Sequence, residues 1–406
     1  MGRSSSSRQA AKFRCNYLVT RRYERPKRLS NGAKISANGS FPDRAGQGRR
    51  ELCVALRWND LPAEVLATLR KGAVIPAHPL ALDSARKFDE RRQRALTRYY
   101  VDAGSGGLAV GVHTTQFAIR EVGLYEPVLS LAMKTARETA KKPLVMIAGL
   151  AGKTTQAVKE AQTAVGLGYH GGLLSLAAMK GSNEDELIEH AKKVAAEIPL
   201  VGFYLQPAVG GILLNASFWK RFAQIENVVA IKMAPFNRYR TLDVIRGVVE
   251  AKAEDRVTLY TGNDDHIVLD LVTPFVVVRD GKPVTVRIKG GLLGHWSCWA
   301  QRAVELLDRA QKEAVQSSVS AEMLALDSQV TDCNAAIFDV ANDFHGVICG
   351  CHEILRRQGL LEGIWCLDPK ETLGPGQKEE IDRVYAAYPH LNDDAFVREN
   401  LSRWLG

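Results

Sequence analysis

Short runs of apolar residues alternate with amphipathic segments of helical periodicity along most of the chain after residue 60. Each run is long enough for one strand, and a helical pattern follows each of them. We predict strands at residues 74–77, 107–111, 144–148, 172–176, 200–205, 228–233, 257–261 and 284–288. Continuous apolar strands indicate a parallel sheet that is buried on both faces. Eight consecutive strand–helix units of about 30 residues predict an α/β fold, the (β/α)8 TIM barrel.

A doubly wound sheet is the alternative to a barrel, but such sheets usually have fewer strands and a glycine-rich first turn. No G-x-G-x-x-G sequence follows the first predicted strand. The turn signature at residues 279–283 predicts a hairpin inserted just before the last barrel strand. We therefore assign residues 60–318 to the barrel.

The strand pattern stops after residue 318, and only helical patterns follow. We predict helices at residues 321–344, 346–359, 377–387 and 394–405. Residues 319–406 are thus expected to form a C-terminal helical extension that packs on the barrel or on a partner subunit.

The net charge of +9 is unevenly distributed along the chain. Residues 1–50 carry 13 Lys and Arg and two acidic residues, whereas the rest of the chain has 41 basic and 43 acidic residues, a balance of −2. A DNA-binding domain would spread its positive charge over structured elements, so we expect no nucleic acid as a partner. Residues 1–55 are expected to be a basic, disordered tail without a secretory signal.

The cysteine pattern predicts a reducing compartment, and the hydropathy predicts no membrane span. Seven cysteines without regular spacing suit the cytoplasm, and the longest uncharged stretch is broken by several Pro, Gly and Asn residues, so no membrane span is expected. The group Cys349-Gly350-Cys351-His352 lacks the C-x-x-C spacing of zinc sites. We predict buried structural cysteines and no metal.

Two polar residues stand at the ends of predicted strands, where barrel enzymes place their chemistry. Lys232 ends the apolar run 228–233. Burial would lower the pKa of its ammonium and free the amine to attack a carbonyl, although a lysine that reaches the rim or pairs with a carboxylate is the alternative. Tyr204 lies near the end of the run 200–205 and could transfer protons to a neighbouring carbonyl oxygen, or serve as an ordinary core tyrosine.

These segments resemble a known enzyme family. Gly202-Phe203-Tyr204-Leu205-Gln206-Pro207 and Val229-Ala230-Ile231-Lys232, with the Lys 28 positions after the Tyr, are similar to the Y-x-x-P and G-I-K signatures of the dihydrodipicolinate synthase/N-acetylneuraminate lyase family. Residues 259–265 resemble its seventh-strand S-G-D-D pattern, and the similarity extends over about residues 70–390. Members are Schiff-base (β/α)8 aldolases and lyases with a helical C-terminal extension.

The resemblance implies an activity and its residues. Lys232 would form a covalent imine with pyruvate or another 2-oxo acid, and Tyr204 would relay protons. No further cofactor is implied, because the protonated imine is itself the electron sink. A homodimer or homotetramer is implied as the assembly. The resemblance assigns substrate binding to Gly111, Val112, His113, Thr114, Val209 and Gly262.

The sequence also departs from the family pattern. Where the family has G-T-T-G-E, this chain has Gly111-Val112-His113-Thr114-Thr115, so that either Val112 and His113 replace the two threonines or a two-residue shift restores them. His113 then either supplies a proton or hydrogen bond, or lies at the rim bonded to backbone. The carboxylate-binding Arg of the synthases is Val209 here.

These departures argue against a dihydrodipicolinate synthase and for a neutral or apolar aldehyde as the partner of the 2-oxo acid. The alternative function is a catalytically lapsed barrel that acts as a binding or regulatory protein. Trapping an imine with pyruvate and borohydride distinguishes the two.

Overall fold

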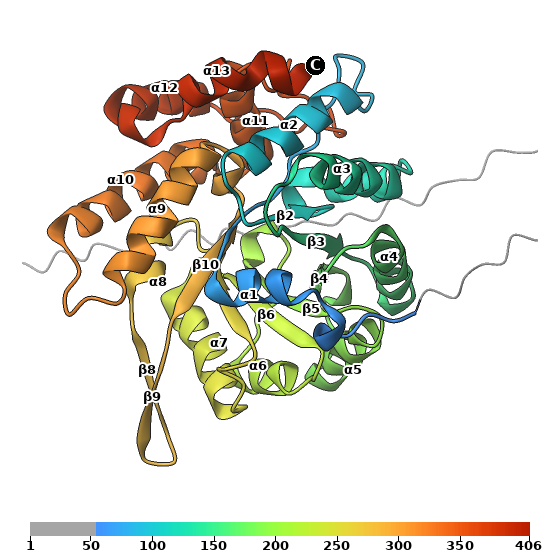
Figure 1. Cartoon of the computed structure of the whole chain (residues 1–406), viewed down its shortest axis with the longest axis vertical. Helices are drawn as coiled ribbons and strands as arrows, with labels where there is room; N and C mark the ends of the chain where they lie inside the picture. The colour runs from blue at the N-terminus through green and yellow to red at the C-terminus, as the bar shows by residue number, and fades with distance from the viewer. Residues whose placement is uncertain (1–53) are drawn as a thin grey trace, which may run out of the picture. The chain divides into compact units, whose positions relative to one another are not determined.

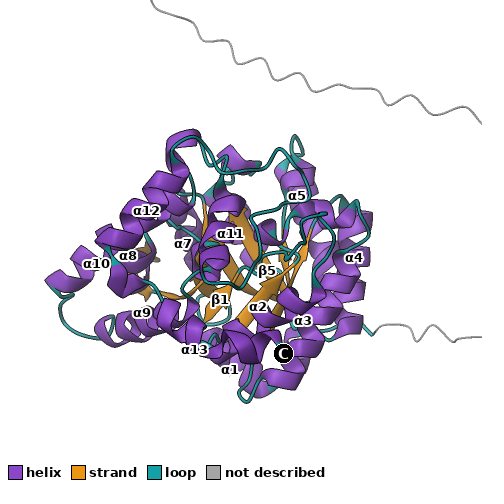
Figure 2. Ribbon diagram, turned by 90° about the horizontal axis from the view of Figure 1, so that it is seen from above, coloured by secondary structure: helices purple, strands orange, loops and turns teal. Residues whose placement is uncertain are grey.

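The computed structural model describes residues 54–406, and these residues contain a closed ring of parallel strands surrounded by helices (Figures 1 and 2). The ring has eight strands in the order β1-β10-β7-β6-β5-β4-β3-β2. A parallel bridge between Ala77 and Ala109 joins its two ends. The strands are β1 (Val74–Pro76), β2 (Gly107–Val110), β3 (Val145–Leu150), β4 (Gly171–Leu174), β5 (Leu200–Leu205), β6 (Val228–Ala234), β7 (Thr258–Thr261) and β10 (Ile288–Leu293). The predicted (β/α)8 barrel is confirmed. The expected tail of residues 1–55 lies outside the described residues but for its last two.

Helices follow the strands because the apolar stripe of each amphipathic segment packs on the outer face of the ring. One buried cluster, which includes Val110, Met146 and Ile231, fills the space between strands and helices, and a second cluster, with Ile147 and Val229, fills the barrel interior. The helices of the barrel are α1 (Ala63–Lys71), α2 (Glu90–Asp102), α3 (Tyr125–Thr139), α4 (Thr154–Leu167), α5 (Glu184–Ala195), α6 (Ala216–Ala223), α7 (Arg238–Glu250), α8 (Ile267–Val272) and α9 (Ala300–Glu313).

A two-stranded antiparallel hairpin, β8 (Phe275–Arg279) and β9 (Lys282–Val286), lies between β7 and β10 and projects from the barrel (Figure 1). The predicted insertion is therefore confirmed. The last barrel strand was expected at residues 284–288, and this expectation is wrong, because residues 282–286 pair with β8 and the ring is completed by Ile288–Leu293. Short apolar runs of hairpin and barrel strands look alike in sequence.

Four helices follow α9: α10 (Ala321–Ile337), α11 (Val347–Arg357), α12 (Gln377–Ala387) and α13 (Asp394–Leu405). The helix expected at residues 321–344 ends at Ile337 instead, since Asp339, Asp343 and Phe344 adopt positive φ angles that a helix cannot continue through. In Figures 1 and 2, α11 lies above the strands. This places C-terminal residues over one end of the barrel.

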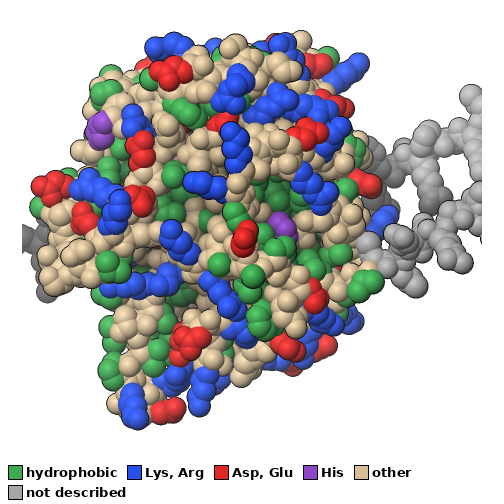
Figure 3. All heavy atoms as spheres, viewed as in Figure 1, with side chains coloured by type: hydrophobic (Ala, Val, Ile, Leu, Met, Phe, Trp, Pro, Cys, Tyr) green, Lys and Arg blue, Asp and Glu red, His purple; other side chains and the backbone are tan. Residues whose placement is uncertain are grey.

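The outside of the described part of the chain carries both signs of charge. Basic and acidic side chains are mixed over the face shown in Figure 3, in keeping with the near-neutral balance of the residues after 50. None of the helices among residues 54–406 has the length and apolar character needed to span a membrane. The five cysteines in this part of the chain are free and buried, as the sequence predicts.

Candidate active site

A cavity of about 50 Å³ lies at the carboxyl ends of the barrel strands, where side chains of β5, β6 and the loops after β2 and β7 meet. Its roof comes from the C-terminal helical region, through Phe338, Phe344 and Val347. Most of the remaining lining is apolar: Ala77, Val112, Phe203, Leu205, Val209, Ala234 and Phe236. One water molecule needs about 10–15 Å³ of such volume, so the cavity has room for a compound of a few heavy atoms.

Lys232 on β6 points into this cavity and is 7% exposed. Burial lowers the pKa of Lys232 to about 8, and the nearby carboxylate of Asp264 opposes that shift. Gly262 makes room for the lysine, because a Cβ atom at residue 262 would lie 2.6 Å from Lys232 Cε. Gly262 lines the cavity as expected, and its structural contribution is this close approach.

Asp264, in the loop after β7, is the second charged residue that lines the cavity. Its carboxylate accepts a hydrogen bond of 2.9 Å from the backbone N–H of His295. Burial raises the pKa of Asp264 to about 7. A buried acid and a buried amine with pKa values near neutrality can exchange protons with a reacting substrate. No role was expected for this residue from the sequence, although an acid in the loop after a barrel strand is the signal that could have found it.

The loop after β2 is fixed by its two threonines. Thr114 Oγ1 donates to Ala77 O at 2.6 Å and Thr115 Oγ1 to His78 O at 2.6 Å. Thr115 Oγ1 also accepts from the N–H groups of Gly111 (3.0 Å) and Val112 (3.2 Å). The backbone N–H groups of Gly111 and Val112 therefore already donate to Thr115, so they are not free to bind the carboxylate of a substrate.

The next two residues of this loop face the cavity. His113 and Thr114 both line it, together with Val112, whereas Gly111 does not. The backbone N–H groups of His113 and Thr114 donate to no acceptor among residues 54–406. Burial and the charge of Lys232 lower the pKa of His113 to about 4, so the imidazole is neutral at pH 7.

Tyr204 does not line the cavity of Lys232, so the two strand-end residues do not meet there, as the proton relay implied by the resemblance would require. Its hydroxyl donates to Leu214 O (2.9 Å) and accepts from Leu214 N–H (3.1 Å), and its ring packs on Trp219 of α6. The residue opposite Lys232 in the β5–β6 pair is Phe203. Successive side chains of a strand point to opposite faces, so Phe203 faces inward and Tyr204 faces the outer helices.

The reason is a one-residue irregularity in the β5–β6 register. The pair begins with Leu200 opposite Val228, a separation of 28 positions, and continues with Val201 opposite Ala230, a separation of 29. The separation of 28 would place Tyr204 opposite Lys232, and the irregularity replaces it with Phe203.

Val209, at the end of a short 3-10 helix (Pro207–Val209), lines the cavity at the position where an arginine was expected in the synthases. Lys232 is the one Lys or Arg among the residues that line it. Within residues 54–406, no group of three or more His, Cys, Asp or Glu side chains is arranged to hold a metal ion.

The comparisons with known proteins agree with this architecture. The sequence model of the Dihydrodipicolinate synthetase family matches residues 71–273. A 4-hydroxy-tetrahydrodipicolinate synthase of Persephonella marina is 25% identical over 47% of this chain and 65% of its own length. N-acetylneuraminate lyase 2 of Escherichia coli is 22% identical over 76% of this chain and 90% of its own. For the first of these relatives, the match spans less than two thirds of the protein.

Solved structures share the fold. The dihydrodipicolinate synthase of Acinetobacter baumannii, in complex with pyruvate, superposes with a TM-score of 0.63 at 17% identity, over 78% of this chain and 98% of its own. A Clostridium difficile protein crystallised with mannosamine superposes with the same score at 16% identity, over 78% of this chain and 99% of its own. Because the family model covers half of the sequence and the barrel is the one these structures share, the chain belongs to the Dihydrodipicolinate synthetase family.

Proposed function

We propose that this protein is a lyase or aldolase that forms a Schiff base between Lys232 and pyruvate or another 2-oxo acid, and that its second substrate is a neutral or apolar aldehyde. One observation carries the proposal: a lysine amine whose pKa is lowered to about 8 faces a small enclosed cavity at the carboxyl ends of the strands. At pH 7 about a tenth of such an amine is unprotonated, a far larger fraction than for an exposed lysine.

The first step joins the amine to the ketone carbon. Lys232 Nζ attacks the carbonyl and gives a carbinolamine, which loses water to leave an imine. Loss of water needs a proton on the departing hydroxyl, and Asp264, with a pKa raised to about 7, is the carboxylic acid among the residues that line the cavity. The same carboxyl group can take up the proton released when the amine becomes neutral. Asp264 therefore takes the proton-transfer role that the family resemblance gave to Tyr204.

The protonated imine then withdraws electrons from the neighbouring carbon. A bond at that carbon can break or form through an enamine, and the reverse sequence of steps releases the 2-oxo acid. The carboxylate of the acid is bound by the N–H groups of His113 and Thr114, which donate to no acceptor among residues 54–406. Backbone donors hold a carboxylate whatever side chains surround them.

The lining favours an aldehyde without charge. A carboxylated aldehyde would need a second cation, and Arg serves this purpose best. Val209, Phe236 and the roof residues supply apolar surface instead, and Lys232 is consumed by the imine. An unpaired carboxylate buried there would be destabilised by several kcal/mol. This supports an activity other than dihydrodipicolinate synthesis.

The test is covalent trapping. The full-length protein is incubated with pyruvate and sodium borohydride, and the intact mass is measured. We expect one reduced pyruvate on each chain, attached to Lys232 by peptide mapping, and no adduct on Lys232→Met. Lys252 provides a matched control, so that Lys252→Met should be trapped like the wild type. Absence of an adduct would leave the alternative, a catalytically lapsed barrel with a binding or regulatory role. Native mass spectrometry of the same samples tests the homodimer or homotetramer that the family leads us to expect.

A further inference from the structure

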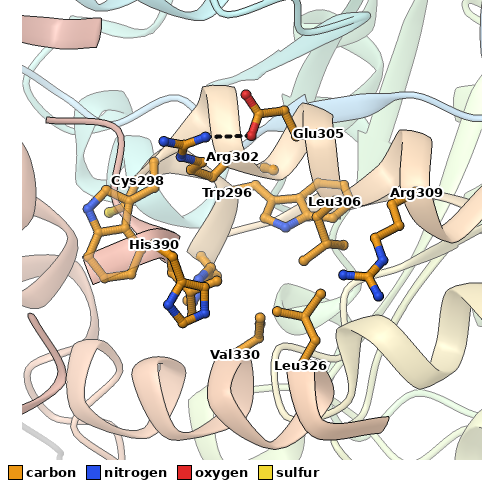
Figure 4. A pocket seen from close by; sticks show the side chains of 13 residues that line it. Trp296, Cys298, Arg302, Glu305, Leu306, Arg309, Leu326, Val330 and His390 are labelled. Carbon is orange, nitrogen blue, oxygen red and sulfur yellow. Dashed lines mark hydrogen bonds and ion pairs between the residues drawn. The ribbon is translucent and has the colours of Figure 1, made fainter. Parts of the chain in front are cut away.

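A second cavity, of about 210 Å³, lies between α9 and α10, outside the cavity of Lys232 (Figure 4). The short 3-10 helix His295–Ser297 forms its inner wall, and His390 lies at its edge. His295 connects the two cavities, because its side chain lines the second one while its backbone N–H binds Asp264 in the first. The Lys232 chemistry does not use this second space.

The inner wall holds a hydrogen-bond donor without a partner. Trp296 is 1% exposed. Its indole Nε1 faces the cavity in Figure 4 and donates to no acceptor among residues 54–406. The indole N–H of Trp404, by comparison, donates to Asp102 at 2.6 Å. Trp296 Nε1 is not among the fully enclosed polar atoms that lack a partner, of which Trp219 Nε1 is one. It opens into the cavity, so its N–H is available to an acceptor group of a ligand.

The opening carries two arginines of α9, Arg302 and Arg309. Arg302 already has partners within the protein, since it donates to Glu305 at 2.7 Å and to Asn392 O at 3.1 Å. Arg309 has only a loose ion pair, 3.5 Å between its Nε and Glu313, and its terminal nitrogens donate to no acceptor recorded among residues 54–406. Figure 4 shows its guanidinium group beside the apolar part of the cavity.

Leucine and valine side chains complete the lining between these donors. Leu306 comes from α9, and Leu326 and Val330 come from α10. These three residues offer an apolar surface close to the indole N–H and to the guanidinium of Arg309 (Figure 4). The cavity thus combines an apolar interior, a neutral donor and a cation.

We propose that this cavity binds a small amphipathic monocarboxylate, with an alkyl chain against Leu306, Leu326 and Val330 and a carboxylate that accepts from Trp296 and Arg309. A cation would gain nothing from either donor. Glu305 at the opening disfavours a dianion such as a phosphate monoester. A neutral alcohol of equal length would lose the charge-assisted hydrogen bond to Arg309.

The experiment is isothermal titration calorimetry of the full-length protein with octanoate, octanol and octylamine as probes. We expect one octanoate per chain and binding at least about tenfold weaker for the other two. Trp296→Phe removes the N–H but keeps the ring, and Arg309→Gln removes the charge, so each should weaken octanoate binding about tenfold. Arg309 is 46% exposed, so its variant tests the site even where Trp296→Phe impairs folding.

Two controls separate this site from others. Arg398→Gln changes an exposed arginine of α13 and should leave octanoate binding unchanged. Lys232→Met should also bind octanoate like the wild type, whatever the result of the imine trapping. No binding of octanoate, binding unchanged by both Trp296→Phe and Arg309→Gln, or octanol binding as tightly as octanoate would each overturn the proposal. Loss of binding in Lys232→Met would place the octanoate in the first cavity and overturn it as well.

Discussion

Lys232 Nζ lies 4.4 Å from the centre of the Phe203 ring, directly across the β5–β6 strand pair. The ring has two opposite effects on the amine. Its π-electrons favour the ammonium form, while its bulk excludes water and favours the neutral form. Because the pKa of Lys232 is lowered to about 8, exclusion of water dominates. Phe203 thus lowers the pKa of Lys232 by excluding water and takes no part in proton transfer itself.

Replacing Phe203 with Ala should raise the pKa of Lys232. We expect the midpoint of Lys232 deprotonation, derived from the pH dependence of pyruvate trapping, to lie near pH 8 in wild type. Water admitted by Phe203→Ala should move this midpoint up by about one pH unit, which slows trapping about tenfold at pH 7. The measurement is the trapping rate with cyanoborohydride between pH 6 and 10. Phe203→Leu keeps an apolar side chain and should leave the midpoint near its wild-type value; an equal shift in both variants would contradict the exclusion of water as the cause.

Asp264→Asn should move the same midpoint in the opposite direction. The carboxylate of Asp264 raises the pKa of Lys232, so its removal lowers the midpoint below pH 8. Loss of the proton donor should also reduce the maximal trapping rate by about 100-fold. Asp265→Asn is the matched control, because Asp265 does not line the cavity. A maximal rate unchanged in Asp264→Asn would remove Asp264 from the proton transfer.

Tyr204→Phe should reduce stability and leave trapping intact. The Tyr204 hydroxyl both donates to and accepts from the Leu214 backbone. Its loss leaves two buried backbone groups without a partner, which lowers the free energy of unfolding by about 1–3 kcal/mol. Urea denaturation and the trapping assay on the same protein check both parts. Slower trapping with unchanged stability would instead indicate that Tyr204 reaches the substrate.

Val209→Arg should change the choice of aldehyde. An arginine at this position of the cavity lining can pair with a second carboxylate. We expect kcat/KM for an acidic aldehyde, relative to a neutral one, to rise about tenfold or more, equivalent to about 1.4 kcal/mol. Val209→Gln, which adds bulk and polarity without charge, is the control. If the wild type already prefers the acidic aldehyde, another group binds the second carboxylate.

The buried ion pair between Arg120 and Glu160 should be essential for stability. Arg120 donates to both carboxylate oxygens of Glu160 at 2.9 Å and to the carbonyls of Gly111 and Gly149. Arg120→Gln leaves a buried carboxylate uncompensated, and we expect the free energy of unfolding to fall by about 3–5 kcal/mol. The double variant Arg120→Met/Glu160→Leu should recover most of this loss. A single variant as stable as the wild type would show that Glu160 is protonated or hydrated there.

The sequence was sufficient for the barrel because buried parallel strands are apolar on both faces, and eight such runs leave few other folds. It also identified Lys232, since a charged residue within an apolar strand stands out. Tyr204 could not be placed, because a one-residue shift between β5 and β6 reverses which side chain faces inward. The hydrophobic periodicity of the sequence gives no indication of such a shift in register.

Asp264 was missed for a different reason. Followed by Asp265 and His266, it resembles the acidic start of a helix, and α8 does begin at Ile267. Its role depends on the N–H of His295, which comes 31 positions later and approaches only in the folded barrel. Contacts between distant segments of this kind are absent from any local pattern.

The roof of the first cavity has a consequence for the order of events during synthesis. Phe338, Phe344 and Val347 follow Lys232 by more than 100 positions, so the ribosome releases the lysine strand well before the residues that cover it. Until those residues have docked, the amine is in water and has the basicity of an ordinary lysine. We therefore expect the pKa of Lys232 to fall only after the residues up to Val347 have docked on the barrel. A chain truncated before residue 338 should resist trapping for the same reason.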